Sequence, residues 1–313
     1  MKRTFGRNER NQAKNLGVPL AFLLALSLAP ALQAQTPVLS KEYIRAGGQI
    51  LAIESYLSVT VSTAANVQGS PSCCIVATAD FNGDGIPDLV WQNPSTGAAN
   101  IWLMGGTNAT TITQSVQVTS GNSWRIVAAA DFDGDGHPDR LWQDPVNAGA
   151  QVWYMAGTNG TTYQAAGSIP NSNGNPWRIK AAADFNRDGY ADLVWQDPAA
   201  GSVQTWYLGG GRTPTVLSAA TVSGGTSWRI VTAADFNQDG TPDLVWQLPT
   251  TGAVQIWFMG GSNGATTLET TQVTAGNSWC VVAAADFNRD GVPDLVWQQP
   301  NGATVQYWYM TIQ

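Results

Sequence analysis

Three observations predict an all-β fold, a β-propeller of five four-stranded blades closed by an N-terminal strand. A nine-residue aspartate-rich segment begins at Asp80 and returns at Asp131, Asp184, Asp235 and Asp286, so the repeat length is about fifty residues. Each repeat contains four short runs rich in β-branched and aromatic residues, which is the content of one propeller blade. The last repeat ends after its third run, so a strand from elsewhere in the chain must complete it.

Residues 1–34 have the composition of an export signal. Five Lys and Arg residues lie among the first fourteen positions, an apolar run covers residues 16–28, and small residues follow up to Ala34. This order is typical of a secretory signal peptide. We therefore expect a secreted, extracellular protein, cleaved after Ala34 or, alternatively, after Ala31. No later segment reaches the roughly 18 apolar residues of a spanning helix, so no membrane span is expected.

The segment between the signal and the first repeat supplies the missing strand. Residues 35–55 are expected to form an N-terminal linker, and residues 56–313 the propeller. Apolar and polar residues alternate over residues 56–61, which is typical of a strand. Placed beside the third strand of the last repeat, this strand would complete the blade and leave no edge exposed.

The four strands of a repeat follow one order, seen most clearly in the fourth repeat. Its strands are expected at residues 230–234, 244–247, 254–259 and 267–273, with the aspartate-rich loop between the first two. The first strand of most repeats is rich in alanine, which suits the innermost position where the blades converge. Bulky side chains are concentrated on the second and third strands.

The aspartate-rich loop reads D-F-[ND]-x-D-G-x-[PA]-D and has the residue types of a calcium site. Carboxylates this close repel by roughly 4 kcal/mol per pair at 4 Å and a dielectric constant near 20. Ca²⁺ takes six to eight oxygen ligands, and a glycine permits the sharp bend. Asp-Gly pairs also mark ordinary turns, but a turn does not explain the acids at positions 1 and 9. The loop is not an EF-hand, because position 12 is Trp instead of Glu.

We expect about one Ca²⁺ per repeat, held by side chains at loop positions 1, 3, 5 and 9 and by the backbone carbonyl at position 7. The candidate metal ligands are Asp80, Asn82, Asp84, Ile86 and Asp88; Asp131, Asp133, Asp135, His137 and Asp139; Asp184, Asn186, Asp188, Tyr190 and Asp192; Asp235, Asn237, Asp239, Thr241 and Asp243; Asp286, Asn288, Asp290, Val292 and Asp294.

The charge of the chain agrees with metal sites and disfavours nucleic acid as a partner. The formal net charge is −7, and removal of the signal leaves 10 basic and 21 acidic residues, a net charge of −11. Sixteen of these acids lie in the five loops. Five bound Ca²⁺ ions would bring the net charge to about −1. The sequence contains no basic patch that could neutralise phosphates.

The three cysteines suggest how the ring is closed. Cys74 and Cys280 occupy equivalent positions in the first and fifth repeats, where the three middle repeats have Arg. These repeats are neighbours in a closed five-membered ring, and a disulfide persists in an exported protein. We expect a Cys74–Cys280 bridge. Cys73, which replaces a Trp, is an alternative partner for Cys280, and three unpaired thiols are the remaining alternative.

These features resemble the FG-GAP/VCBS repeats of bacterial secreted proteins, whose loops look like those of the integrin α-subunit propeller. The resemblance covers residues 72–313 and is carried by segments such as ADFNGDGIPDLVWQ and GAVQIWFMGG. It implies propeller blades with Ca²⁺ in the loop between the first two strands, and an extracellular binding or adhesion role. Integrin-like rings have seven blades whereas this chain supplies five, so the ring size departs from that pattern.

The tryptophans allow two interpretations. All fourteen lie in the repeats, and their position beside Val and Ile is typical of packing between blades. The alternative is sugar stacking in clefts between blades, with the Gln after each second-strand Trp as a hydrogen-bonding group. The candidate glycan-binding residues of this lectin alternative are Trp91, Trp142, Trp195, Trp246 and Trp297.

An enzyme is not expected. Outside the loops, the mature chain has only five acidic residues, and they suggest no acid/base pair. The sole histidine, His137, is at the variable loop position 7, so a nucleophile–histidine arrangement has no candidate. We expect a monomeric, non-catalytic calcium-binding module whose partner is an extracellular protein or, in the lectin alternative, a glycan.

Overall fold

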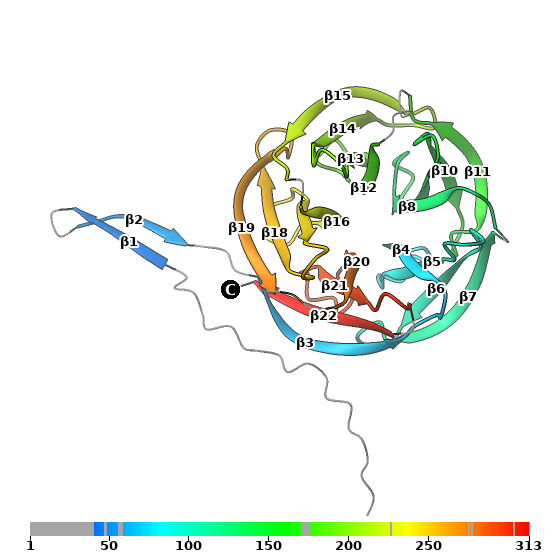
Figure 1. The fold of residues 1–313 in the computed structure, drawn as a ribbon, viewed down its shortest axis with the longest axis horizontal. Helices are drawn as coiled ribbons and strands as arrows, with labels where there is room; N and C mark the ends of the chain where they lie inside the picture. The colour runs from blue at the N-terminus through cyan, green and yellow to red at the C-terminus, as the bar shows by residue number, and fades with distance from the viewer. Residues whose placement is uncertain are drawn as a thin grey trace, which may run out of the picture. The chain divides into compact units, whose positions relative to one another are not determined.

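The chain forms a ring of five four-stranded antiparallel sheets, which confirms the five-bladed propeller (Figure 1). The computed structural model describes residues 41–46, 49–55, 59–119, 121–170, 176–225, 227–274, 276, 278–302 and 304–312. The expected signal peptide, residues 1–34, lies outside this part. Within the described residues, no helix has the length and apolar character needed to cross a membrane.

Each blade consists of strands a to d, from the ring axis outward, and the strands are consecutive in blades 1 to 4. Blade 1 contains β4 (Cys74–Ala79), β5 (Asp88–Gln92), β6 (Ala99–Gly105) and β7 (Thr111–Thr119); blade 2 contains β8 (Arg125–Ala130), β9 (Asp139–Gln143), β10 (Ala150–Ala156) and β11 (Thr162–Ser168). Blade 3 contains β12 (Arg178–Ala183), β13 (Asp192–Gln196), β14 (Val203–Gly209) and β15 (Thr215–Val222); blade 4 contains β16 (Arg229–Ala234), β17 (Asp243–Gln247), β18 (Val254–Gly260) and β19 (Thr266–Thr274).

Blade 5 combines the two ends of the propeller. It contains β20 (Cys280–Ala285), β21 (Asp294–Gln298), β22 (Thr304–Ile312) and, as its outer strand, β3 (Val59–Gln68). The pairing runs antiparallel from Val59 opposite Ile312 to Gln68 opposite Thr304. Closure by an N-terminal strand is therefore confirmed. The strand extends beyond the expected 56–61, because its pairing with β22 continues to Gln68. Residues 56–58 lie outside the described part.

The segment expected as a linker contains a strand pair that the sequence analysis did not predict. Strand β1 (Lys41–Ala46) pairs antiparallel with β2 (Gln49–Ser55), and the two form a separate two-stranded sheet.

The hydrophobic core lies between the blades. Each of the five buried clusters joins residues of two neighbouring blades. In one of them, Ile75 and Trp91 of blade 1 pack with Val305 and Tyr307 of blade 5. Each strand-b Trp is 0–2% exposed and stacks at a tilt on the strand-c Trp of its blade, with ring centroids 4.4–5.0 Å apart. The packing interpretation of these tryptophans accounts for this burial.

A buried glutamine at the end of each strand b links its blade to the next. Its side-chain oxygen accepts a hydrogen bond from the second N–H of the next strand a, at 3.0–3.2 Å. At the closing interface, Gln298 accepts from the Ile75 N–H and donates to the Cys73 carbonyl, at 3.0 and 3.2 Å. The five residues are Gln92, Gln143, Gln196, Gln247 and Gln298. They satisfy backbone groups between blades, so they are not free to serve as the sugar-binding groups of the lectin alternative.

Candidate metal centre

The aspartate at loop position 1 accepts hydrogen bonds from the backbone of its own loop. In blade 1, one Asp80 oxygen accepts the Gly83 N–H at 2.7 Å, and the other accepts the Gly85 N–H at 2.7 Å. The loop bends because position 4 adopts a positive φ of 60–77° in all five blades, and position 6 one of 78–91°. Position 6 is always glycine, the residue that adopts this conformation without strain. These bends bring positions 1 and 3 back toward the start of strand b.

The aspartate at position 9 is fully buried in every blade. These residues, the first of each strand b, are Asp88, Asp139, Asp192, Asp243 and Asp294, each 0% exposed. One oxygen accepts the N–H of the loop phenylalanine at 2.9–3.0 Å, and the other accepts a strand-c N–H at 2.8–3.0 Å. This side chain therefore joins the loop to strands b and c.

The electrostatics of position 9 favour a bound cation. Burial raises the pKa of all five carboxyl groups to about 7, although backbone hydrogen bonds lower it and nearby loop aspartates raise it further. A buried carboxylate is unfavourable without a counter-charge. A divalent ion beside it would remove this cost and the repulsion among the loop acids. The donor set, all oxygen, fits Ca²⁺ or Mg²⁺ rather than a softer metal.

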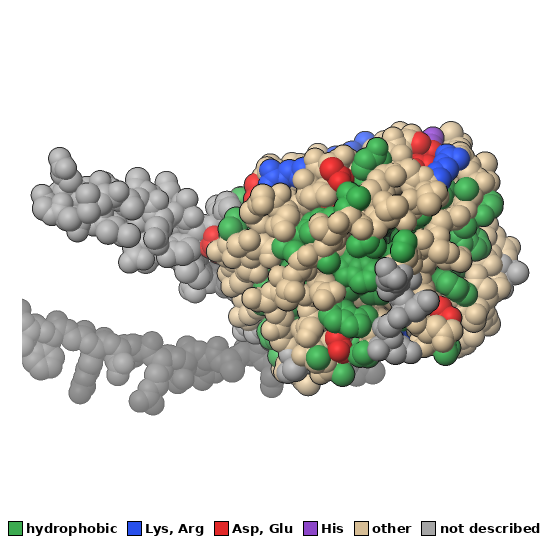
Figure 2. All heavy atoms as spheres, turned by 90° about the horizontal axis from the view of Figure 1, so that it is seen from above, with side chains coloured by type: hydrophobic (Ala, Val, Ile, Leu, Met, Phe, Trp, Pro, Cys, Tyr) green, Lys and Arg blue, Asp and Glu red, His purple; other side chains and the backbone are tan. Residues whose placement is uncertain are grey.

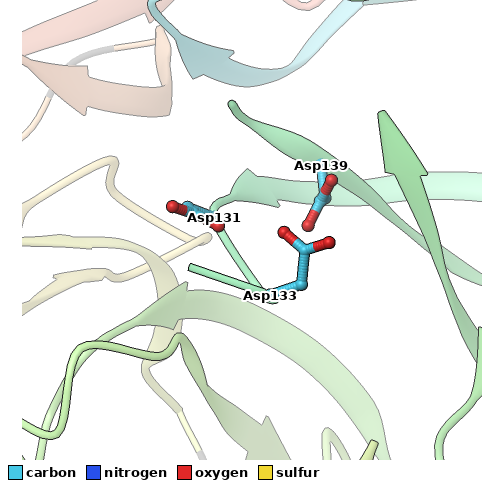
Figure 3. A group of neighbouring side chains, drawn as sticks. All are labelled: Asp131, Asp133 and Asp139. Carbon is cyan, nitrogen blue, oxygen red and sulfur yellow. The ribbon is translucent and has the colours of Figure 1, made fainter. Parts of the chain in front are cut away.

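Loop 2 brings three carboxylates together in the described structure (Figure 3). Asp131, Asp133 and Asp139, at positions 1, 3 and 9, each place one oxygen within 4.8 Å of the others. Figure 3 shows Asp133 and Asp139 pointing toward each other. Asp135, at position 5, is outside this group, and its carboxylate accepts the His137 N–H at 2.9 Å. The structure thus assembles positions 1, 3 and 9, while position 5 remains at the solvent-facing tip.

The other four loops differ at position 3, where Asn replaces Asp. In blade 1, the Asn82 amide donates to the Asp84 carboxylate at 3.0 Å, and the equivalent pairs are 2.9–3.1 Å apart. The amide oxygen accepts the position-5 N–H in these loops, as in Asp84 N–H to Asn82 at 3.0 Å. Positions 3 and 5 are therefore held together, although these loops have one fewer carboxylate.

Two arginines lie near the acids of loop 2, and the sequence analysis missed both. Arg212, in the turn after strand β14, contacts Asp133 at 2.7 Å and Asp135 at 3.5 Å. Arg140 is 2% exposed in β9, and the adjacent Asp139 partly offsets the lowering of its pKa by burial. Arg140 occupies the strand position where the other blades have Leu, so comparison of the repeats could have identified it. No comparable pattern in the sequence marks Arg212.

The position-7 side chains turn away from the loop interior and contact the rest of the ring. Ile86, Thr241 and Val292 are buried, at 0–7% exposure, whereas His137 and Tyr190 are half-buried. Thr241 accepts a hydrogen bond from Arg187, which is at position 4 of the preceding loop. The carbonyl ligand expected at position 7 is thus compatible with the variety of side chains there.

The structure corrects the candidate glycan-binding residues. Trp91, Trp142, Trp195, Trp246 and Trp297 are enclosed between blades, so their ring faces are closed to a sugar. Trp stacks on sugars, but strand b is buried along its whole length in every blade, which places these tryptophans in the core.

The expected Cys74–Cys280 bridge is not formed: both thiols are free and exposed, and Cys73 is free and half-buried. Burial raises the pKa of Cys74, and the nearby Cys73 and Cys280 raise it further.

Comparison with known proteins supports the repeat assignment. A family model described as FG-GAP-like repeat matches residues 80–142 and 184–246. Each match begins at a position-1 aspartate and ends at the strand-b Trp of the next blade. Phosphatidylinositol-glycan-specific phospholipase D from Bos taurus is 30% identical over 131 residues, covering 37% of this chain and 16% of that protein. The chain therefore spans about one sixth of that relative.

Two solved structures match this chain at low sequence identity. A DUF4221 family member from Bacteroides vulgatus matches with a TM-score of 0.45 and 7% identity, covering 82% of this chain and 98% of that one. The allergen Mala s 1 of Malassezia sympodialis matches with a TM-score of 0.46 and 12% identity, covering 77% and 78% of the two chains.

Proposed function

We propose that this chain, whose residues 80–142 and 184–246 match an FG-GAP-like repeat model, is an exported, calcium-stabilised propeller that acts as a non-catalytic binding or adhesion module. The observation that carries the proposal is the set of five buried position-9 aspartates, each beside further loop acids. One Ca²⁺ per loop would supply the missing positive charge. Extracellular calcium modules bind at about 10⁻⁴–10⁻³ M, so such sites would fill outside the cell.

Calcium would have a structural role in the loops and no catalytic role. The position-1 and position-9 aspartates, with the Asn or Asp at position 3, would hold the ion. The ion would fix the hairpin between strands a and b of each blade. All strands a run in the same direction, so the five loops would form one rigid face of the ring. Figure 2 shows basic and acidic side chains along the upper edge of the ring seen from the side.

The metal part of the proposal is tested by the number of ions bound. We expect about one Ca²⁺ per loop by isothermal titration calorimetry and by elemental analysis of the mature chain. The substitution Asp243→Asn keeps the side-chain shape but removes the buried charge, so it should remove one ion. The control Glu269→Gln removes a charge from the outer strand β19. An unchanged ion count in Asp243→Asn would contradict the assignment of loop 4.

The binding part is tested separately. An array of extracellular proteins and glycans is probed with the mature chain in millimolar Ca²⁺ and again after chelation. We expect calcium-dependent binding to a protein, with no turnover of the bound molecule. Binding to glycans alone would overturn the protein-partner assignment, and cleavage of a bound molecule would overturn the non-catalytic one.

A further inference from the structure

The ring axis contains a cavity that the calcium loops do not use. Its volume is about 90 Å³, and residues of all five strands a line it. The lining residues are the third, fourth and fifth of β4, β8, β12, β16 and β20. Each of these strands is the inner edge of its sheet. An edge strand presents backbone N–H and C=O groups that no neighbouring strand pairs, so the cavity wall offers polar donors as well as small side chains.

One blade places a cation in this cavity. The third residue of strand a is Lys180 in blade 3, whereas the other four blades have valine there, at Val76, Val127, Val231 and Val282. Lys180 is half-buried, and the other lining residues are alanines, valines and two threonines, Thr78 and Thr232. A single ammonium group therefore interrupts an otherwise uncharged ring of side chains.

This ammonium has no counter-charge in the described structure. Among the described residues, no carboxylate lines the cavity, and Lys180 has neither a hydrogen bond nor an ion pair. The charged groups that act on it are Arg229 and Arg178, both positive; with the larger effect of burial, they lower its pKa. Unpaired buried charges are unfavourable, and they are relieved by a counter-ion or by loss of the proton.

We propose that this axial cavity is an anion site in which Lys180 and the inner-edge backbone N–H groups bind one small anion. Lys180 supplies the positive charge of the lining, and the edge N–H groups supply directed donors. A liquid water occupies about 30 Å³, so the cavity holds an anion of about one to four heavy atoms, such as chloride or acetate. Sugars, nucleotides and peptides are too large for it.

The experiment measures the melting temperature of the calcium-loaded protein at constant ionic strength while gluconate is replaced by chloride or acetate. Calcium is supplied as calcium gluconate, because gluconate is too large for the cavity. We expect the melting temperature to rise with chloride or acetate and to saturate, as for a ligand that binds only the folded state. Lys180→Val, which gives blade 3 the residue of the other four blades, should abolish this saturable rise.

A relocation variant separates an anion site from a general effect of salt. In Lys180→Val/Val231→Lys, the cation moves to the equivalent position of blade 4, and the saturable anion dependence should return. The single variant and the relocated variant should both bind calcium as the wild type does. If chloride and acetate stabilise Lys180→Val as much as the wild type, or if the wild type does not respond, the proposal is overturned.

Discussion

Individual buried side chains connect the loops, strands and blades of this ring by hydrogen bonds. The position-9 aspartate connects a loop to two strands of its own blade, and the strand-b glutamine connects that blade to the next. Both are polar residues buried within a hydrophobic interface. Because buried backbone groups need partners, each of these side chains supplies hydrogen bonds that apolar packing between the blades could not.

The glutamine link predicts a cost for its removal. Gln196→Leu keeps the volume but leaves the Ile230 N–H and the Trp228 carbonyl, now 3.1 and 3.0 Å from the amide, without these bonds. We expect a loss of about 1–3 kcal/mol in the free energy of unfolding, measured by urea denaturation of the calcium-loaded protein. Gln151→Leu is the control, since Gln151 bonds only the Ser168 hydroxyl at 3.5 Å. Equal stability of the two variants would contradict the structural role of Gln196.

Lys180 predicts a dependence of stability on pH. Its pKa is lowered in the folded state, mainly by burial and then by Arg229 and Arg178. The unfolded chain therefore binds more protons in the window between the lowered pKa and the ordinary value of about 10.4, and stability rises with pH there. In gluconate, Lys180→Val should be more stable than the wild type near pH 7, and this difference should shrink toward pH 10.5. A stability difference between the two proteins that does not change with pH would contradict this prediction.

At the scale of elements, the interfaces between blades are of two kinds, which differ in the first residue of strand a. Arg125, Arg178 and Arg229 each donate to a proline carbonyl in the preceding blade, at 2.6–3.1 Å. Cys280 and Cys74 occupy this position at the two interfaces of blade 5. Blade 5 therefore lacks the arginine link on both sides, and it is also the blade made from two distant parts of the chain. A covalent link at this position would compensate for the missing hydrogen bonds.

The proposed export to an oxidising compartment predicts that two of the three free thiols form a disulfide there. Cys74 and Cys280 begin strands β4 and β20, which contact each other in the ring, and Cys73 precedes Cys74. We expect peptide mapping under non-reducing conditions to find Cys280 linked to Cys74, or to Cys73 as the alternative. The bridge closes a loop of about two hundred residues, for which the chain-entropy model gives roughly 4–5 kcal/mol of stabilisation. Three fully alkylatable thiols in the oxidised, folded protein would exclude the bridge.

The elements show what the sequence could predict and what it could not. The strands of blade 4 begin and end within one residue of the expected bounds, because alternation and the Gly-containing turns define them locally. The clustering of acids in loop 2 could also be predicted, since the aspartate pattern repeats five times in the sequence. Arg212 was not, because it reaches loop 2 of another blade through a tertiary contact. The hydrogen-bond partners of the strand-b glutamines could not be predicted for the same reason. Gln92 and Ile126, for example, come together only when the blades pack.

At the scale of the whole molecule, the ring depends on one non-local pairing. Strands β22 and β3 are more than 230 residues apart in the chain, yet they pair along nine positions. Side chains support the pairing: the Thr60 and Thr311 hydroxyls are 3.2 Å apart, and Ser62 donates to the Tyr309 carbonyl at 3.0 Å. Without β3, strand β22 would present an open edge, which is a site for association with other chains.

Removal of β3 by truncation at the N-terminus tests whether this strand is needed to close the ring. A chain that begins at residue 70 lacks β3 and should melt at a lower temperature and form oligomers, seen by size-exclusion chromatography with light scattering. The matched control begins at residue 57 and retains all of β3. If the chain without β3 stays monomeric and melts with the control, the closing strand is not needed for the ring.

The stability of the whole ring is expected to depend on a divalent ion at the five aspartate loops. The most direct measurement is the melting temperature of the mature chain across a calcium titration and after chelation with EDTA. Each site that binds only the folded state contributes about 2.7 kcal/mol when calcium is at one hundred times its Kd. We expect the melting temperature to rise through the millimolar range and to fall back in EDTA. An identical melting temperature with and without calcium, from a protein that retains no metal, would contradict the account.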